Sequence, residues 1–297
     1  MSSKRDDSAA GGRAAGDREH PLLGVLTHVV LCAVAVVVLY PVLWVVRMAL
    51  SPSQAFASGL SPIPSDVTLQ NFTDVVGHTD LAGTWVFGHQ LLNSLVVATA
   101  TAVVGVGLAT SAAYAFARFK FPGAKLGMGA LLVTQMFPGT MMMIPLYILL
   151  DKLNLLDSQL GLVLVYATTS IPFSTWMLKG YFDTIPHELE EAARMDGAST
   201  STIFFKIILP LARPAIAITA LFSFMTAWNE FILAAKLMNS ETSYTLPVVL
   251  QGYVGAKSTA WGHFAAGAIL VSLPVMALFF ALQKHLVGGL TAGSVKG

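Results

Sequence analysis

The chain has 297 residues, of which 55% are hydrophobic and only 11% are charged, whereas a typical soluble domain carries about 25% charged residues. Its 17 Lys and Arg residues nearly balance 16 Asp and Glu residues, and no clustered basic face of the kind that binds nucleic acid is present. The single cysteine, Cys32, excludes an intrachain disulfide and a cysteine metal site, and the histidines show no metal-binding spacing. This composition predicts a protein of the lipid bilayer.

The first twenty residues, 1–20, mix charged residues with Gly, Ala and Ser and contain no apolar run, which predicts a disordered tail. The apolar run that follows is longer than the core of a secretory signal peptide, so we expect it to be retained as a membrane span. Residues 21–297 are expected to form one transmembrane domain.

Six stretches are long and apolar enough to cross the bilayer, which requires about 20 mostly apolar residues in a helix. They are residues 22–46, 91–117, 126–150, 160–178, 214–235 and 262–282. The sequence therefore predicts an all-α polytopic membrane protein with six transmembrane helices.

The positions of the basic residues predict the orientation of these spans, because Lys and Arg near span ends tend to stay in the cytoplasm. If the N-terminus is inside, thirteen of the 17 Lys and Arg residues fall in inner segments and the other four fall in outer segments. Both termini are therefore predicted to be cytoplasmic, in a bacterial cytoplasmic (inner) membrane.

The inner segment between the fourth and fifth spans concentrates charge and should fold outside the lipid. Pro186 suits the first position of a helix, and glutamates follow it where carboxylates favour the positive end of the helix dipole. Gly197 is typical of a helix stop, so we expect a short helix from about Pro186 to Asp196. Ser199 or Thr200 can cap the helix that follows.

This short helix has the composition of a docking element. Small side chains at Ala192 and Ala193 let another surface approach its backbone closely. Charged residues that can form oriented contacts around that seam are Glu190, Glu191, Arg194 and Asp196. A cytoplasmic helix joined rigidly to two spans is also a lever, since moving it moves both spans.

A seven-residue pattern in this segment resembles a known family. The pattern is Glu191, Ala192 and Ala193, then Gly197, then Ile207, Leu209 and Pro210. It is similar to the EAA loop, here residues 181–213, of permease subunits in binding-protein-dependent ATP-binding-cassette (ABC) importers. The resemblance implies the type I importer permease fold, in which the short helix is a cytoplasmic coupling helix seated in a separate ATPase subunit.

The resemblance also implies where the energy comes from. The chain has no GxxxxGK[ST] phosphate loop, so it is expected to be a transport subunit and not an enzyme, with no cofactor of its own and with ATP and Mg bound by the partner. The implied partners are two copies of an ATPase subunit, a second permease subunit and an extracytoplasmic sugar-binding protein.

Two further segments resemble the six-span second subunit of maltose-type carbohydrate permeases. The C-terminal tail, residues 284–297, is similar to a tail that reaches the ATPase subunits, which implies contacts from Thr291, Ala292, Gly293 and Lys296; a frayed polar terminus is the alternative. Residues 239–260, predicted to lie outside the cell, are similar to the loop that probes the binding protein, which implies roles for Ser243, Tyr244, Gln251, Gly252 and Tyr253.

Three polar residues in or near spans are candidates for a gate or for lining the sugar path. Glu230 follows Asn229 near the end of the fifth span, where an ionisable group is costly; a local hydrogen-bonded cap is the alternative. Gln135 could line the path or join two helices by a hydrogen bond.

Two other functional classes of membrane protein have sequence signatures of their own. An ion-coupled secondary transporter would place ionisable groups near the midplane and show related halves, and an intramembrane enzyme would need a catalytic constellation in the spans. Neither is evident. Maltose or maltodextrin is the first expectation for the sugar, with trehalose or another oligosaccharide as the alternative.

Overall fold

The computed structural model of the protein describes residues 21–57, 61–255 and 259–294. In these ranges the chain is helical and contains no strand, with only two isolated bridges, Thr79 to Trp85 and Val254 to Thr259. The predicted all-α fold is confirmed. The predicted disordered tail, residues 1–20, lies outside the described residues.

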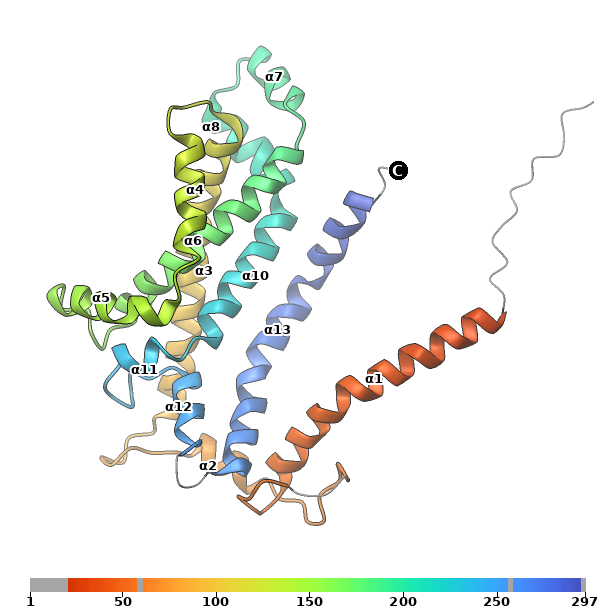
Figure 1. The fold of residues 1–297 in the computed structure, drawn as a ribbon, viewed down its shortest axis with the longest axis vertical. Helices are drawn as coiled ribbons and strands as arrows, with labels where there is room; N and C mark the ends of the chain where they lie inside the picture. The colour runs from red at the N-terminus through yellow and green to blue at the C-terminus, as the bar shows by residue number, and fades with distance from the viewer. Residues whose placement is uncertain (1–20, 58–60, 256–258, 295–297) are drawn as a thin grey trace, which may run out of the picture.

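Figure 1 shows the helices in order along the chain. They are α1 (Pro21–Leu50), α2 (Gln70–Val76), α3 (Phe87–Arg118), α4 (Ala124–Thr134), α5 (Gly139–Lys152), α6 (Gln159–Thr184), α7 (Glu188–Met195), α8 (Thr200–Ile203), a π-helical turn η1 (Phe204–Ile208), α9 (Leu209–Leu211), α10 (Arg213–Asn229), α11 (Ala234–Leu237), α12 (Leu246–Gly252) and α13 (Trp261–Ser294).

Four helices in the described part of the chain, α1, α3, α6 and α13, are individually long and apolar enough to cross a membrane. Two bent pairs, α4 with α5 and the segment 200–211 with α10, raise the number to six if each pair forms one span. The predicted count of six is therefore the upper value that the helices allow by length and composition.

The third predicted span, 126–150, is not one continuous helix but the bent pair α4 and α5. The chain breaks between α4 and α5, which meet at 99°. Pro138 adopts φ −58° and ψ 130° directly before α5, because its ring fixes φ and it has no N–H to continue the preceding helix. The residue before a proline also disfavours the helical region.

The fifth predicted span, 214–235, also ends earlier than expected. Helix α10 stops at Asn229, and Glu230 is extended, with ψ 127°. The sixth expected span, 262–282, is instead longer, because α13 continues to Ser294. The helical signal in the sequence located these elements, but the local hydrogen bonds of their ends decided the boundaries.

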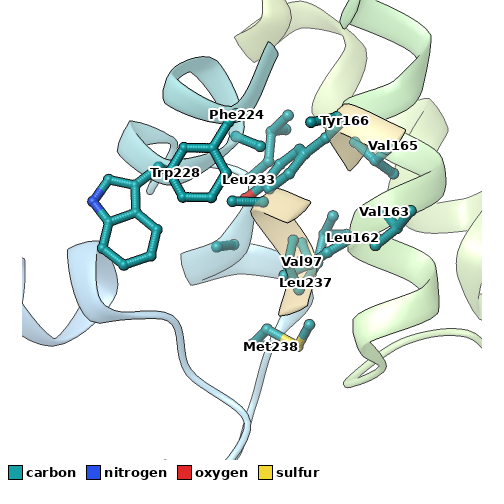
Figure 2. Close-up of a cluster of buried hydrophobic side chains, with 14 of the residues drawn as sticks. Val97, Leu162, Val163, Val165, Tyr166, Phe224, Trp228, Leu233, Leu237 and Met238 are labelled. Atoms are coloured by element: carbon teal, nitrogen blue, oxygen red, sulfur yellow. The ribbon is translucent and has the colours of Figure 1, made fainter. Parts of the chain in front are cut away.

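The core lies where α3, α6 and α10 pack together. Figure 2 shows its largest cluster, in which Val97 of α3, Tyr166 of α6 and Phe224 of α10 gather with neighbouring side chains. Deeper contacts are polar and small, since Ser223 bonds both Ser170 (2.8 Å) and Ser174 (3.1 Å) across the helices. Small polar side chains let membrane helices approach closely, and here they join α6 to α10.

Helix α1 lies away from this core. Its apolar 18-residue window is entirely unburied, and Figure 1 shows it diverging from the bundle. Only its end is covered, where Met48 and Ala49 pack with Ala265 and Ala266 of α13. An apolar face of this length must be covered by lipid or by another protein.

The two ends of the bundle carry different elements. Figure 1 shows α7 and α8 at one end and α2, α11 and α12 at the other. The ends of α1 and α13 nearest the chain termini both point toward the end that carries α7. The candidate coupling elements and the outer elements are thus separated by the length of the bundle.

Candidate coupling surface

Helix α7 forms where the sequence predicts it. It runs from Glu188 to Met195, so it begins two residues after Pro186, and it has three glutamates in its first turn and Arg194 in its last. These charges complement the helix dipole. Gly197 follows with φ +82°, and its N–H donates to the carbonyl of Arg194 at 3.0 Å. This left-handed conformation favours glycine and ends the helix.

Of the two residues expected to cap the next helix, Ser199 does so. Its Oγ accepts from the N–H of Thr202 at 3.2 Å. The chain then passes through the π-helical turn η1 and bends by 75° into α10. Pro210 lies two residues before this bend, and a proline has no N–H to donate to the carbonyl four residues earlier. The elbow joins α7 and α8 to the fifth span without a flexible linker.

Glu190 points inward and is 1% exposed. Its carboxylate accepts a hydrogen bond from Arg118 Nε and another from the Tyr114 hydroxyl at 3.0 Å, both from the end of α3. The side chains of Arg118 and Glu190 are each 2% exposed. Arg118 Nη2 also donates to the carbonyl of Ile185 at 2.9 Å, at the turn between α6 and α7. This buried ion pair fixes α7 against the end of α3.

The burial of Glu190 changes its expected role. The sequence places it among the docking contacts, but the structure turns its carboxylate away from the surface. Arg194 is the bridge between the two sides, because its Nη2 lies 3.4 Å from Glu190 while half of its side chain is exposed. Sequence reasoning missed Arg118 and Tyr114, which are more than seventy positions before Glu190. Arg118 carried only the signal of a basic residue at a span end.

The exposed side of α7 has the features of a docking surface. Met195 is 89% exposed and Leu189 is 44% exposed, so two apolar side chains project from an otherwise polar helix. The other expected docking residues that are exposed are Glu191, Ala192, Arg194, Asp196 and Gly197. Ala193 is half-buried and packs on the core below. We call the exposed residues of 189–197 the coupling surface.

The last three residues of the pattern lie behind this surface. Ile207 packs against the buried cluster that contains Phe182 and Ile208, and Leu209 lines a cavity between α3, α10 and α13. Pro210 lies two residues before the bend described above. These positions hold the coupling surface in place, and none of them is fully exposed.

The cavity beside these residues has a volume of about 810 Å³ and is mostly apolar, with Thr99, Thr110 and Ser111 as its hydroxyl side chains. Sugar pathways need several polar groups that match hydroxyls. This cavity therefore does not have the lining of a sugar site. The described residues contain no group of three His, Cys, Asp or Glu residues placed to bind a metal.

At the opposite end, residues 238–246, which we call the outer segment, are held by side-chain amides. Gln90 donates to the carbonyl of Glu241 at 3.1 Å. Asn93 donates to the carbonyls of Thr242 and Tyr244 at 2.7 and 3.1 Å. Both amides are buried and belong to the first turns of α3. The outer segment is therefore fixed to the same helix that holds Glu190.

Asp157 supports the outer segment from the α5 to α6 turn. Its carboxylate accepts from the N–H of Asn239 at 2.9 Å and from the Ser240 hydroxyl at 3.0 Å. Burial by itself raises the pKa of Asp157. The hydrogen bonds from Asn239 and Ser240 together lower the pKa by more than burial raises it, so the pKa lies below its usual value. The carboxylate is thus ionised at neutral pH, and its hydrogen bonds hold Asn239 and Ser240 at the start of the outer segment.

The residues expected to meet a binding protein differ in exposure. Ser243 is half-buried and shares a 2.6 Å hydrogen bond with Ser240, and Tyr244 packs against the main core cluster. Gln251 and Gly252, at the end of α12, are exposed. Tyr253 is half-buried and lies against the ring of His263. The open part of this region is the end of α12 rather than the outer segment.

Two of the three gate candidates make local hydrogen bonds in the structure. Glu230 accepts from the N–H groups of Leu233 and Ala234 at 2.9 and 3.2 Å. It also accepts from the Tyr166 hydroxyl at 2.6 Å. It is the hydrogen-bonded cap that the sequence offered as the alternative. Gln135 donates to the carbonyl of Thr169 at 2.9 Å, joining α4 to α6. Asn229 is exposed at the end of α10.

The C-terminal candidates are described only in part. Thr291, Ala292 and Gly293 belong to the last turns of α13, but their side chains lie outside the described residues, as does all of Lys296. The contacts expected from this tail stay a prediction.

Known proteins resemble this chain over nearly all its length. The galactooligosaccharides transport system permease protein GanQ of Bacillus subtilis is 36% identical over 275 residues, covering 92% of this chain and 95% of that protein. The maltodextrin transport system permease protein MalD of Streptococcus pneumoniae is 36% identical over 273 residues, with the same two coverages. A solved bacterial ABC transporter that imports alginate has a chain with TM-score 0.70 and 24% identity, covering 90% of this chain and 97% of that chain.

The solved structure supports the fold, and the relatives support the family. The family model described as the binding-protein-dependent transport system inner membrane component matches residues 103–291. That range includes α7, its buried anchor on α3 and most of α13. The apolar helices agree with the multi-pass inner membrane protein that this description implies. The chain therefore belongs to the family of binding-protein-dependent transport system inner membrane components.

Proposed function

We propose that this chain is the six-span second permease subunit of an ATP-driven sugar importer and that α7 is its coupling helix. The observation that carries the proposal is the coupling surface, an exposed helix with two projecting apolar side chains that is anchored to the bundle by a buried ion pair. Such a helix can receive a force from a partner and pass it to the spans without first bending.

The energy for transport comes from the partner. Two copies of an ATP-binding-cassette subunit bind ATP and Mg, and their closure displaces α7. Helices α6 and α8 leave the two ends of α7 through short turns, so the displacement moves the fourth and fifth spans together. The spans then alternate between inward and outward exposure of a path that this chain shares with a second permease subunit. This chain performs no hydrolysis and binds no cofactor.

Partner surfaces follow from the exposed faces. The unburied face of α1 and the exposed helices α4 and α5 provide apolar area for the second permease subunit and for lipid. The end of α12, with Gln251 and Gly252, faces an extracytoplasmic sugar-binding protein. The C-terminal tail reaches the ATPase subunits. Both termini are cytoplasmic, in agreement with the shared direction of α1 and α13 toward α7.

Maltose or maltodextrin is the proposed substrate, with trehalose or another oligosaccharide as the alternative. The support is the 36% identity to the maltodextrin permease protein over 92% of this chain. The equal identity to the galactooligosaccharide permease protein supports the wider class of oligosaccharides.

Substitutions that change the charge of the coupling surface test the function. The chain is co-produced with its binding-protein, second-permease and ATPase partners, and uptake of radiolabelled maltose is measured in proteoliposomes. Glu191→Lys and Gly197→Asp should abolish uptake while membrane abundance stays normal. Asp66→Lys, the same charge reversal on an exposed loop, is the control and should transport normally. Normal uptake in Glu191→Lys, or ion-driven uptake by the purified chain alone, would refute the proposal.

The position of α7 can be tested separately. Met195→Cys in a Cys32→Ser background places a single cysteine at a side chain that is 89% exposed. A membrane-impermeant thiol reagent should label it in inside-out vesicles and not in intact cells. Labelling from the cell exterior would place α7 on the wrong side for an ATPase.

A further inference from the structure

At one end of α3, Arg118 and Tyr114 hold α7 through Glu190, and we call these contacts the first clamp. Arg118 and Tyr114 both bond the carboxylate of Glu190, and the side chains of Arg118 and Glu190 are 2% exposed. If α7 moved while α3 stayed in place, both charges would remain buried and lose their partner. Leaving a buried charge unpaired is among the most costly changes a protein can undergo. Helix α3 must therefore follow α7.

The opposite end of α3 carries a second clamp. Gln90 and Asn93 bond the backbone carbonyls of the outer segment, and Ser94 Oγ accepts from the N–H of Leu246 at 2.7 Å. Gln159 of α6 donates to the Asn93 side chain, which leaves that amide little freedom to rotate. The outer segment is thus attached to α3 by four hydrogen bonds of buried side chains.

A single unbroken helix joins the two clamps. Helix α3 has 32 residues, which at 1.5 Å per residue makes it about 48 Å long. It contains no proline, and it packs along α6 and α10 in the core. Helix α10 does not span this distance, because the chain bends at Ala212 just before it and the helix ends at Asn229. Helix α6 also reaches both clamps, through Gln159 and its C-cap Ile185, but it contains Pro172. Helix α3 is the proline-free helix that joins the outer segment to α7.

We infer that α3 transmits displacement between the outer segment and the coupling helix, with Asn93 and Arg118 as the positioning residues at its two ends. The inference rests on the proposed function, because it requires α7 to be the coupling helix. When a binding protein presses on the outer face, the outer segment, α3 and α7 shift as one body. The ATPase subunits then receive the signal through Glu190.

The test uses the complete complex in proteoliposomes and the ratio of ATPase activity with binding protein to activity without it. Arg118→Met and Asn93→Ala should each lower this ratio about 2- to 30-fold, the range in which residues along a coupling network act. The double variant should lower it no further than the stronger single variant, because both residues lie on one path. Lys179→Met, which breaks an exposed ion pair with Asp183 on α6, is the control and should not change the ratio.

Loss of folding is separated from loss of transmission by two further variants. Arg118→Lys keeps the charge but offers no planar fork for Glu190 and the Ile185 carbonyl together, so it should fold and still show a lowered ratio. The double variant Arg118→Glu with Glu190→Arg reverses the ion pair. Its ratio should be higher than that of Arg118→Glu alone. Independent, additive effects of Asn93 and Arg118, or an unchanged ratio in Arg118→Lys, would overturn the inference.

The outcome also distinguishes the inference from the function on which it rests. If the unmodified complex shows no stimulation by binding protein and no maltose uptake, the proposed function has failed. If Glu191→Lys uncouples transport while the Arg118 and Asn93 variants remain fully coupled, only transmission through α3 has failed.

Discussion

Replacing the two neighbouring glutamates of α7 separates anchoring from docking. Glu190 is buried against Arg118 and Tyr114, whereas Glu191, one residue later, is exposed. Glu190→Ala removes the partner of a buried guanidinium, and Glu191→Ala removes a solvated carboxylate. We expect the first change to destabilise the fold and the second to leave it intact.

The magnitudes follow from the burial of each group. Breaking a buried ion pair by removing one partner costs about 3–5 kcal/mol, and both side chains of this pair are 2% exposed, so solvent screens it little. The Tyr114 hydroxyl loses its acceptor as well, but this effect overlaps with the first and is not added. For Glu191→Ala the expected change is within about 0.5 kcal/mol, as for an ordinary surface substitution.

Chemical unfolding of the purified chain in detergent micelles measures the difference. The midpoint for Glu190→Ala should fall clearly below that of the unmodified chain, while Glu191→Ala should follow the unmodified curve. In the assembled complex, retention of the ATPase subunit is measured by pull-down. Here Glu191→Ala should have the clear effect, because the exposed Glu191 side chain contacts the ATPase subunit in the proposed function. Equal unfolding curves for the two variants would refute the placement of Glu190 as a buried anchor.

Three further changes address the rest of the fold. Gly161→Ala would place a methyl group 2.2 Å from the carbonyl oxygen of Leu155 and should lower the free energy of unfolding by about 1–3 kcal/mol, while Gly180→Ala, which meets no atom within 4 Å, should not lower it. Glu230→Ala should cost about 1–3 kcal/mol in the same assay, because a buried hydroxyl and the cap of α11 lose their acceptor. The pKa of Asp157 is lowered in the folded chain, so its ionised carboxylate stabilises the outer segment fully at pH values above the unfolded pKa of about 3.9. This stabilisation is lost as pH falls through the pKa that Asp157 has in the folded chain. External proteolysis of the outer segment should therefore rise below about pH 4 in the unmodified chain and be insensitive to pH in Asp157→Asn.

Local chemistry in the sequence determined the elements near the coupling surface. Gly197 predicted the end of α7 because the left-handed conformation favours a residue without a side chain. The sequence offered Ser199 or Thr200 as the next cap, and the structure selects Ser199. The apolar runs predicted the membrane helices, since the bilayer demands a fixed length of apolar helix. The basic residues at the span ends predicted the orientation on which the proposed function relies.

Tertiary structure decided what depends on distant partners. Pro138 lies at the break between α4 and α5, but the sequence does not give the 99° angle between them, because a proline permits several bends and packing selects one. Glu190 and Glu191 are chemically identical and adjacent, so only the position of Arg118, on another helix, made one an anchor and left the other on the surface. A sequence pattern reports the periodicity of a helix, whereas the direction in which each side chain finds its partner is fixed only when the helices pack.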